Sequence, residues 1–345
     1  MMLHAILKSH TRKALCALAL TGVAVAGNAI AQTTVKYGMA AVSASFSSTL
    51  IGGAVPEVYA KHGIKLEITD FRGNSNNCVA AVLSGAVDVC QVGSSTVSDA
   101  VAEGGDFKII AVTTSVAHEF VLSSKTLAKL NGVTAASPLD DRLRALKGLR
   151  MVATGPGTPN YLVIDAALRR VGLTVADTKF RTLVDTVAMM EGIRNDQIDV
   201  AMWTVGTLSP VLADKSGVRW LNLAAKEIPE ISAMPYVVTM SLSSWASKNN
   251  AAVIGLRAAI SESVELMNKE PAKYSAAIKA KYFPQLDQAA WDESYRLALP
   301  AYFRGATVSK AGWDSLIKMQ VTGGSTKDYS KASYEKVFVP DAQIK

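Results

Sequence analysis

Apolar residues along the chain follow two spacings, one typical of amphipathic helices and one typical of buried strands. Both occur within residues 79–95. Apolar residues recur at helical spacing over Val79–Leu83, and Gly85 follows as a helix stop. The β-branched run Val87–Val92 then has the composition of a buried strand, and Gly93-Ser94-Ser95 supplies a turn with cap residues for a following helix. This stretch therefore predicts a helix, a strand and a loop that opens a second helix.

The same pattern returns further along the chain. In Ile193–Thr204 a helix end is again followed by a strand, with Asp199 aligned to Asp88 and Val200 aligned to Val89. Strands and helices alternate around both segments without a hairpin signal, which predicts parallel sheets wrapped by helices. Two copies of one unit indicate two similar lobes of α/β type. Asp88 lies at the start of its strand, away from the loop, so we interpret it as structural.

The order of the predicted elements divides the chain into four parts. We expect residues 1–31 to be a signal peptide, residues 32–118 the first part of lobe 1, and residues 119–235 lobe 2. Residues 236–345 are expected to form a return strand and C-terminal helices that pack on lobe 1 and the hinge. The helices predicted in this last part are Ser244–Lys269, Pro271–Tyr282, Asp287–Leu299 and Ser309–Val321.

The N-terminal segment has the three regions of a secretory signal. Basic residues precede the apolar run Ala14–Ala26, and Ala29-Ile30-Ala31 provides small residues for signal peptidase, so cleavage is expected before Gln32. The apolar run is shorter than the roughly 20 residues that a membrane span needs, which argues against an anchor. We therefore expect an exported protein.

Composition and charge narrow the class of protein. Hydrophobic residues make up 49% of the chain and charged residues 19%, which is typical of a globular protein. The chain has a net charge of +7, and the signal contributes three basic and no acidic residues, leaving +4 on the mature chain. Because there is no dense Lys/Arg stripe with interleaved aromatic residues, we do not expect nucleic acid as a partner. The mild positive charge suits an anionic ligand and suits solubility equally well.

Cysteine and histidine are scarce in the mature chain. Cys78 and Cys90 either form a disulfide in an exported protein or remain buried thiols, and their separation does not decide between the two. Only His62 and His118 remain of the four histidines, so neither a metal site nor a cofactor is expected. The chain has no nucleotide-binding loop, nucleophile elbow or metalloprotease motif, so no catalytic machinery is visible.

In open α/β sheets, ligands bind at the carboxyl ends of strands, where helix N-termini offer free N–H groups. This rule selects four loops, Ala41–Phe46, Arg72–Ser75, Gly93–Thr96 and Gly155–Asn160. The candidate ligand-binding residues are Ser43, Ser45, Phe46, Arg72, Gly73, Asn74, Gly93, Ser94, Ser95, Gly155, Thr158 and Trp203.

Three kinds of contact are expected from these candidates. Arg72 either grips a carboxylate or sulfonate through two parallel hydrogen bonds or is a solvated surface residue. The hydroxyl groups of Ser94, Ser95 and Thr158 either cap their helices or contact the ligand. Trp203, at the end of a buried strand, either stacks on a ligand or packs between the lobes.

Four segments carry a resemblance to a known family. They are YAKHGIKLE at Tyr59–Glu67, LSGAVD at Leu83–Asp88, LKGLRM at Leu146–Met151 and IDVAMW at Ile198–Trp203. Their order and spacing resemble those of the periplasmic solute-binding proteins of nitrate, sulfonate and taurine ABC uptake systems, a family that includes receptors for thiamine-pyrimidine precursors and aromatic carboxylates. The chain departs from the family pattern at Thr204-Val205-Gly206, where an acidic residue and proline are common.

The resemblance implies a type II periplasmic binding protein fold, with two Rossmann-like lobes joined by a hinge and C-terminal helices. It also implies a periplasmic monomer that captures a small organic anion, such as a sulfonate or an aromatic carboxylate, and delivers it to an ABC permease in the inner membrane. The same fold includes enzymes, so the alternative is a periplasmic enzyme acting on a small organic acid. A third option is a receptor that serves an ion-driven transporter or a sensor kinase.

Overall fold

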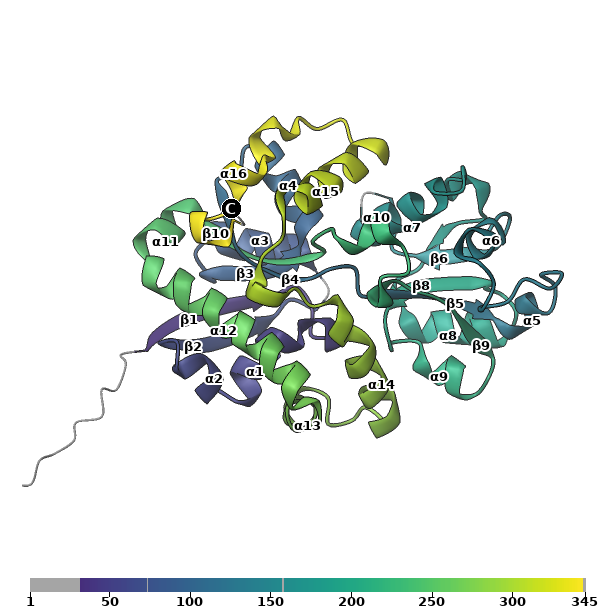
Figure 1. Cartoon of the computed structure of the whole chain (residues 1–345), viewed down its shortest axis with the longest axis horizontal. Coiled ribbons are helices and arrows are strands. Elements are labelled where there is room, and N and C mark those ends of the chain that lie inside the picture. Colours follow the sequence, from purple (N-terminus) through teal and green to yellow (C-terminus); the bar gives the residue numbers. More distant parts are fainter. Residues whose placement is uncertain (1–31, 73, 157, 344–345) are drawn as a thin grey trace, which may run out of the picture. The chain divides into compact units, whose positions relative to one another are not determined.

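The computed structural model describes residues 32–72, 74–156 and 158–343 (Figure 1). The predicted signal peptide at residues 1–31 and the candidate ligand residue Gly73 lie outside the described residues. The described chain forms two five-stranded sheets, called sheet A and sheet B below. Among the helices of the described part, none combines the length and the apolar character that crossing a membrane requires.

Sheet A has the strand order β2-β1-β3-β10-β4. Strands β2, β1 and β3 are parallel, whereas β10 lies antiparallel between β3 and β4. The strands are β1 (Thr33–Met39), β2 (Ile64–Asp70), β3 (Val89–Gly93), β4 (Phe107–Thr114) and β10 (Val237–Leu242).

Sheet B has the strand order β7-β6-β8-β5-β9. Strand β6 is parallel to β7 and β8, whereas β5 is antiparallel to β8 and β9. The strands are β5 (His118–Ser123), β6 (Met151–Ala153), β7 (Arg181–Thr182), β8 (Val200–Thr204) and β9 (Gly217–Asn222).

The prediction of purely parallel sheets is wrong, because each sheet contains one antiparallel strand. Strand β5 follows β4 after only Ser115–Ala117, where the chain passes from sheet A to sheet B, and β10 is the strand that returns to sheet A. Both strands are buried and combine apolar with polar residues, as the parallel strand β3 also does, so their composition does not reveal their direction.

Helices surround both sheets (Figure 1). Those before β10 are η1 (Ala44–Phe46), α1 (Ser47–Ala54), α2 (Glu57–Ala60), α3 (Ser75–Leu83), α4 (Ser94–Ala102), α5 (Ser124–Leu127), α6 (Leu139–Arg144), α7 (Pro159–Arg169), η2 (Val175–Asp177), α8 (Thr186–Arg194), α9 (Ser209–Ala213), η3 (Leu223–Ala225) and α10 (Pro229–Ser232). Those after β10 are α11 (Ser243–Lys248), α12 (Asn250–Lys269), α13 (Pro271–Tyr282), α14 (Gln288–Ala298), η4 (Leu299–Ala301), η5 (Arg304–Ala306), α15 (Lys310–Thr322), η6 (Tyr329–Ala332), α16 (Tyr334–Val337) and η7 (Pro340–Ala342).

The C-terminal helices contact elements of both sheets. Helix α12 packs on α1 and β4, and α15 contacts α4 and α7. Helix α14 contacts η1 and α9, and a partly buried ion-pair chain anchors it to sheet B. In that chain the guanidinium of Arg219 lies 2.7 Å from the carboxylate of Glu119 and 2.9 Å from the carboxylate of Glu293 on α14. The C-terminal segment therefore connects the two lobes as well as covering the first.

The two repeated aspartates hold equivalent strands. Asp88 accepts a hydrogen bond from the backbone N–H of Lys36 at 2.8 Å and donates its own N–H to the carbonyl of Lys36. Asp199 makes the same two contacts with the backbone of Arg150 and also accepts from the Thr126 hydroxyl. These contacts confirm the alignment of the two segments and the structural role inferred for Asp88.

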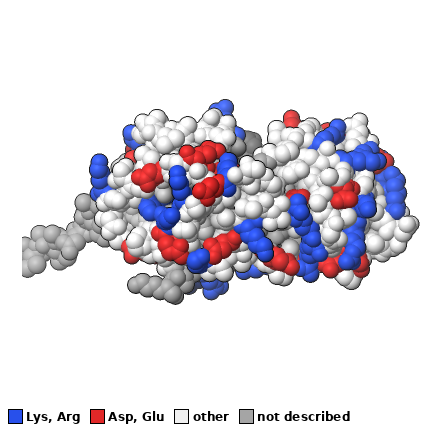
Figure 2. All heavy atoms as spheres, turned by 90° about the horizontal axis from the view of Figure 1, so that it is seen from above, with Lys and Arg blue, Asp and Glu red and all other residues white. Residues whose placement is uncertain are grey.

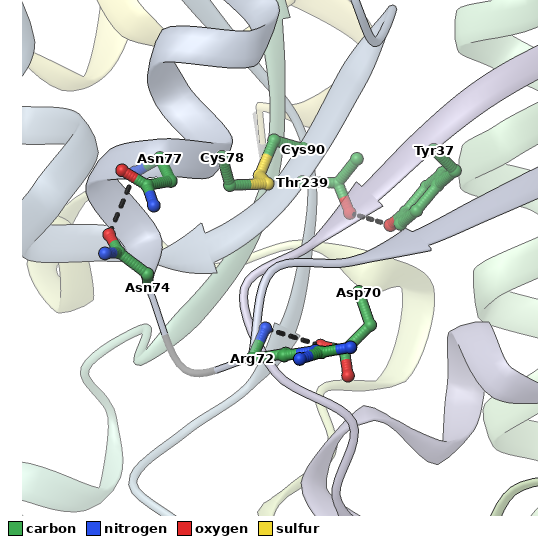
Figure 3. The surroundings of a disulfide bond; sticks show 8 residues. All are labelled: Tyr37, Asp70, Arg72, Asn74, Asn77, Cys78, Cys90 and Thr239. Carbon is green, nitrogen blue, oxygen red and sulfur yellow. Dashed lines mark hydrogen bonds between the residues drawn. A yellow bond between two sulfur atoms is a disulfide. The ribbon is translucent and has the colours of Figure 1, made fainter.

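Cys78 and Cys90 form a disulfide (Figure 3), which resolves the alternative left open by the sequence. The bond joins the first turn of α3 to the middle of β3, and both residues are fully buried. Their Cα atoms are 6.1 Å apart, within the usual range for a disulfide. The helix that precedes the Gly93 loop is thus fixed to the strand that carries it.

Charged side chains are mixed on the face shown in Figure 2, where Lys and Arg alternate with Asp and Glu. Surface ion pairs of the described residues include Arg170 with Asp140 and Glu230, and Arg194 with Glu191. Such exposed pairs contribute little to stability individually. Their mixture gives this face no single dominant sign of charge.

Candidate ligand-binding site

The carboxyl ends of β1 and β3 in sheet A lie beside the start of α7. The N–H of Ala40, directly after β1, donates to the carbonyl of Gln91 in β3 at 2.9 Å. A Cβ atom added to Gly93 would lie 3.3 Å from Cγ of Pro159, the first residue of α7. The predicted loops Gly93–Thr96 and Gly155–Asn160 therefore meet, and glycine at position 93 leaves room for that approach.

The loop after β1 and the end of β2 border open space. A cavity of about 560 Å³ is lined by Val42, from the loop after β1, and by Asp70, the last residue of β2. The other side of this cavity is formed by the end of α13, including Tyr282. Of the predicted loops, Ala41–Phe46 contributes Val42 to this cavity, and no described residue of Arg72–Ser75 lines it.

A hydrogen-bond network joins the segment at His118, where the chain enters sheet B, to the segment at Tyr236, where it returns to sheet A. The Ser94 hydroxyl donates to the carbonyl of Pro235 at 2.6 Å, and the Ser94 N–H donates to the carbonyl of Tyr236. The Tyr236 hydroxyl donates to Oδ1 of Asn160, the second residue of α7, and lies 3.3 Å from Nε2 of His118. Burial lowers the pKa of His118 to about 3, so its ring is neutral at neutral pH.

The loop that carries Ser45 is held over the end of β4 by Tyr302. The Tyr302 hydroxyl donates to the carbonyl of Ala44 at 2.7 Å and accepts from the N–H of Ser47 at 2.8 Å. The backbone of Tyr302 is bridged to Thr114, the last residue of β4. This arrangement brings η1 and the N-terminus of α1 next to the carboxyl end of sheet A.

Several buried polar atoms in this region have no hydrogen-bond partner among the described residues. Buried polar groups in proteins are normally hydrogen-bonded, so such atoms mark places where a ligand or ordered water is expected. Each belongs to a residue that is at most 4% exposed. The atoms are Ser45 Oγ, Ser48 Oγ, Gln91 Oε1, Thr114 Oγ1 and His118 Nδ1.

Sequence reasoning selected Ser45, ranked His118 low and missed Ser48, Gln91 and Thr114. Gln91 was identifiable in principle, because it is the one polar side chain within the apolar strand Val89–Gly93. Ser48 and Thr114 have no such signal, since serine and threonine are common in helices and strands. Their relation to the site depends on Tyr302, which is far away in the sequence.

The candidates in the first loops differ in exposure. Ser43 is half-buried at the start of η1, and Phe46 is buried against the core. Arg72 is exposed, and its backbone N–H donates to the carboxylate of Asp70 at 2.8 Å (Figure 3). Asn74 is also exposed and caps α3 by accepting from a backbone N–H at 2.9 Å.

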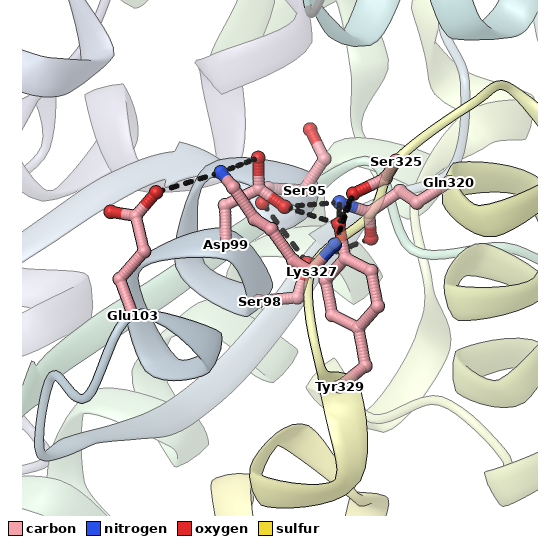
Figure 4. Close-up of polar contacts among 8 residues, drawn as sticks. All are labelled: Ser95, Ser98, Asp99, Glu103, Gln320, Ser325, Lys327 and Tyr329. Carbon is pink, nitrogen blue, oxygen red and sulfur yellow. Dashed lines mark hydrogen bonds and ion pairs between the residues drawn. The ribbon is translucent and has the colours of Figure 1, made fainter.

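Ser94 and Ser95 are buried in the first turn of α4. Helix α4 is in turn tied to the C-terminal segment by a polar cluster (Figure 4). There Asp99 accepts from the Gln320 amide at 2.7 Å and from the Tyr329 hydroxyl at 2.6 Å, and it pairs with Lys327. The C-terminal segment therefore helps to position the helix that begins at Ser94.

The candidates of sheet B serve local structure as well. The Thr158 hydroxyl donates to the carbonyl of Gly155 at 2.7 Å and caps α7. A Cβ at Gly155 would lie 2.6 Å from the Thr182 hydroxyl, so this position is tight. Trp203 is half-buried and packs against a second apolar cluster formed between sheet B and α8 and α9.

No group of three or more His, Cys, Asp and Glu side chains with the geometry of a metal site occurs in the described part of the chain. The side chains that meet at the carboxyl end of sheet A are mainly hydroxyl, amide and neutral imidazole groups. Such groups bind a polar solute by hydrogen bonds.

The two five-stranded sheets and their strand orders define a protein of the periplasmic binding protein fold. The chain belongs to the NMT1/THI5-like family, whose model matches residues 57–274. The resemblance inferred from the sequence is thus confirmed in family and in fold. No curated protein sequence was found to match.

Solved structures with the same fold have low sequence identity to the chain. The periplasmic aliphatic sulphonate binding protein SsuA from Escherichia coli has a TM-score of 0.66 at 15% identity, covering 88% of this chain and 98% of its own. The alkanesulfonate-binding protein SsuA from Xanthomonas axonopodis pv. citri, bound to MOPS, has a TM-score of 0.63 at 16% identity, covering 91% and 99%. The periplasmic nitrate-binding protein NrtA from Synechocystis PCC 6803 has a TM-score of 0.62 at 16% identity, covering 91% and 88%.

Proposed function

We propose that the mature chain is the solute receptor of an ABC importer in the periplasm. It captures one small organic anion, such as a sulfonate or an aromatic carboxylate, between its lobes and delivers it to a permease in the inner membrane. The observation that carries this proposal is the group of buried, unpartnered polar atoms at the carboxyl end of sheet A. Membership of the NMT1/THI5-like family and the sulfonate- and nitrate-binding proteins of the same fold support it.

The donors available for an anion are hydroxyl and backbone N–H groups. Ser95 is buried in the first turn of α4, where the helix dipole and free N–H groups favour negative charge. Ser45 is buried in η1, directly before α1, and offers its hydroxyl group. Arg72 is exposed, and its charge attracts an anion on approach. We assign Ser43, Phe46, Asn74, Gly93, Ser94, Gly155, Thr158 and Trp203 to the walls of the same site, with Phe46 and Trp203 facing the apolar part of the solute.

Solute recovery from freshly purified protein tests this proposal. Native mass spectrometry of the mature chain, expressed with its signal and isolated from the periplasm, should show one small acid per monomer. Incubation should return this solute unchanged, because a receptor does not transform it. Recovery of a chemically altered product would instead identify a periplasmic enzyme and overturn the receptor.

A matched pair of serine variants locates the site. Ser45→Ala removes a buried hydroxyl of the proposed site, and Ser84→Ala removes an exposed hydroxyl at the end of α3. We expect Ser45→Ala to weaken solute binding about tenfold, the effect of one lost hydrogen bond to a charged group. Ser84→Ala should bind like the wild type. Equal affinities of both variants in isothermal titration calorimetry would remove η1 from the site.

A further inference from the structure

The amide of Gln91 has a defined orientation in β3. The hydroxyl of Thr113 lies 3.0 Å from the carbonyl oxygen of Val237. A carbonyl only accepts, so the single hydroxyl proton of Thr113 points to Val237, and the Thr113 oxygen is left as an acceptor. The Gln91 amide therefore directs its NH₂ group at Thr113, 3.1 Å away, and its Oε1 in another direction.

Gln91 Oε1 is thus an acceptor that needs a donor. The residue is fully buried, and none of the described residues donates to this atom. An unpaired buried carbonyl is unfavourable, because its hydrogen bonds to water are lost on folding.

The same reasoning defines the tautomer of His118. The Tyr236 hydroxyl gives its proton to Oδ1 of Asn160. Its oxygen can then only accept from His118, whose Nε2 lies 3.3 Å away, so Nε2 carries the ring proton. Burial keeps the ring neutral, as its low pKa indicates. His118 Nδ1 is therefore an unprotonated acceptor, also without a partner among the described residues.

Both acceptors are linked by hydrogen bonds to residues at the carboxyl end of β4. Gln91 contacts Thr113, and Tyr236, which holds His118, donates its N–H to the carbonyl of Thr114. The hydroxyl of Thr114 is itself buried and unpartnered. The region therefore presents two oriented acceptors in addition to hydroxyl groups, which either donate or accept.

We infer that the solute is a small organic acid that itself carries N–H or O–H groups, and that Gln91 Oε1 and His118 Nδ1 accept hydrogen bonds from them. This inference rests on the proposed receptor function and specifies its solute. Anions without a donor, such as nitrate, sulfate and unsubstituted alkanesulfonates, leave both acceptors unpaired. Each unpaired acceptor weakens binding by about tenfold.

Matched pairs of acids test the inference on the wild-type protein. Taurine is compared with ethanesulfonate, and 4-hydroxybenzoate with benzoate, by isothermal titration calorimetry on protein stripped of bound solute by unfolding and refolding. The solute released by unfolding is identified by mass spectrometry in parallel. We expect the released solute to be an acid with N–H or O–H groups, and the donor-bearing member of any pair that binds to be preferred at least about tenfold.

Variants connect the preference to the two acceptors. Gln91→Met and His118→Phe remove one acceptor each while keeping similar volume, and each should reduce the preference about tenfold. Gln288→Met on the exposed start of α14 and His62→Phe at the Glu262 ion pair are the matched controls, and both should keep it. If either acceptor variant fails to fold, the wild-type pairs and the released solute still decide the question.

The outcomes separate this inference from the proposed function. The inference would be overturned by a released organic acid without a donor, or by equal affinity for both members of a pair. The proposed receptor function would still stand, and ordered water would then satisfy the two acceptors. If no solute is released and none of the four acids binds, both the inference and the receptor proposal fail.

Discussion

Breaking the Cys78–Cys90 disulfide should lower the free energy of unfolding by about 3 kcal/mol. The two cysteines are separated by 12 positions, and closing a loop of this length in the unfolded chain removes about 3 kcal/mol of conformational entropy at 25 °C. The bond joins α3 to β3 in a fully buried position, so both ends are already held by packing in the folded state. The effect should therefore act mainly on the unfolded state.

The assay is guanidinium unfolding of the mature chain, followed by tryptophan fluorescence with and without reductant. Reduction should lower the unfolding midpoint while solute affinity below the transition stays unchanged. The double variant Cys78→Ala/Cys90→Ala should unfold near the reduced midpoint and be insensitive to reductant, since the mature chain has no other cysteine. Identical midpoints for oxidised and reduced wild type would refute the entropic reasoning.

Three further predictions follow from named groups. Burial alone raises the pKa of Asp199, but hydrogen bonds from Arg150 lower it to about 2. Asp199→Asn should therefore lose about 2 kcal/mol of stability at pH 7. In urea unfolding, the stability difference between this variant and the wild type should shrink as pH falls from about 4 to 2. Burial lowers the pKa of His118 to about 3, against a smaller opposing effect of Asn160. The unfolded chain therefore takes up the proton first, and wild-type stability should fall as pH drops from about 6.5 toward 3. If the stability of His118→Phe changes equally over this window, His118 is not the group responsible. Arg72→Ala should slow solute association several-fold at low salt and leave dissociation nearly unchanged in stopped-flow fluorescence, because the side chain is exposed; a faster dissociation would mean a direct grip on the bound solute.

Local elements and the repeated unit were predictable from short-range pattern. The alignment of Asp88 with Asp199 identified two units. Asp88 binds the backbone of Lys36 in β1, and Asp199 binds the backbone of Arg150, directly before β6, in the same way. The end of β3 at Gly93 and the start of α7 after Thr158 were also predictable, since turn and cap residues act within a few positions.

Strand direction and the buried polar atoms were not predictable. Strands β5 and β10 combine apolar with polar residues, as the parallel strand β3 also does, and only the crossing between the sheets sets their direction. Gln91 becomes a ligand candidate only when Thr113 fixes its amide and no described group pairs its oxygen. Thr114 becomes a ligand candidate only because Tyr302, which is bridged to its backbone, places it beside η1. The position of Tyr302 in turn depends on the packing of the C-terminal segment.

The sequence by itself determined the family, the two α/β units and the loops at which a ligand is expected, because these depend on spacing, turns and caps within short segments. The tertiary structure decided that Cys78 and Cys90 are bonded and that Gly93 touches Pro159. It also decided which buried polar atoms lack a partner. Those properties depend on distances between residues far apart in the chain, and the pattern of any one segment carries no information about them.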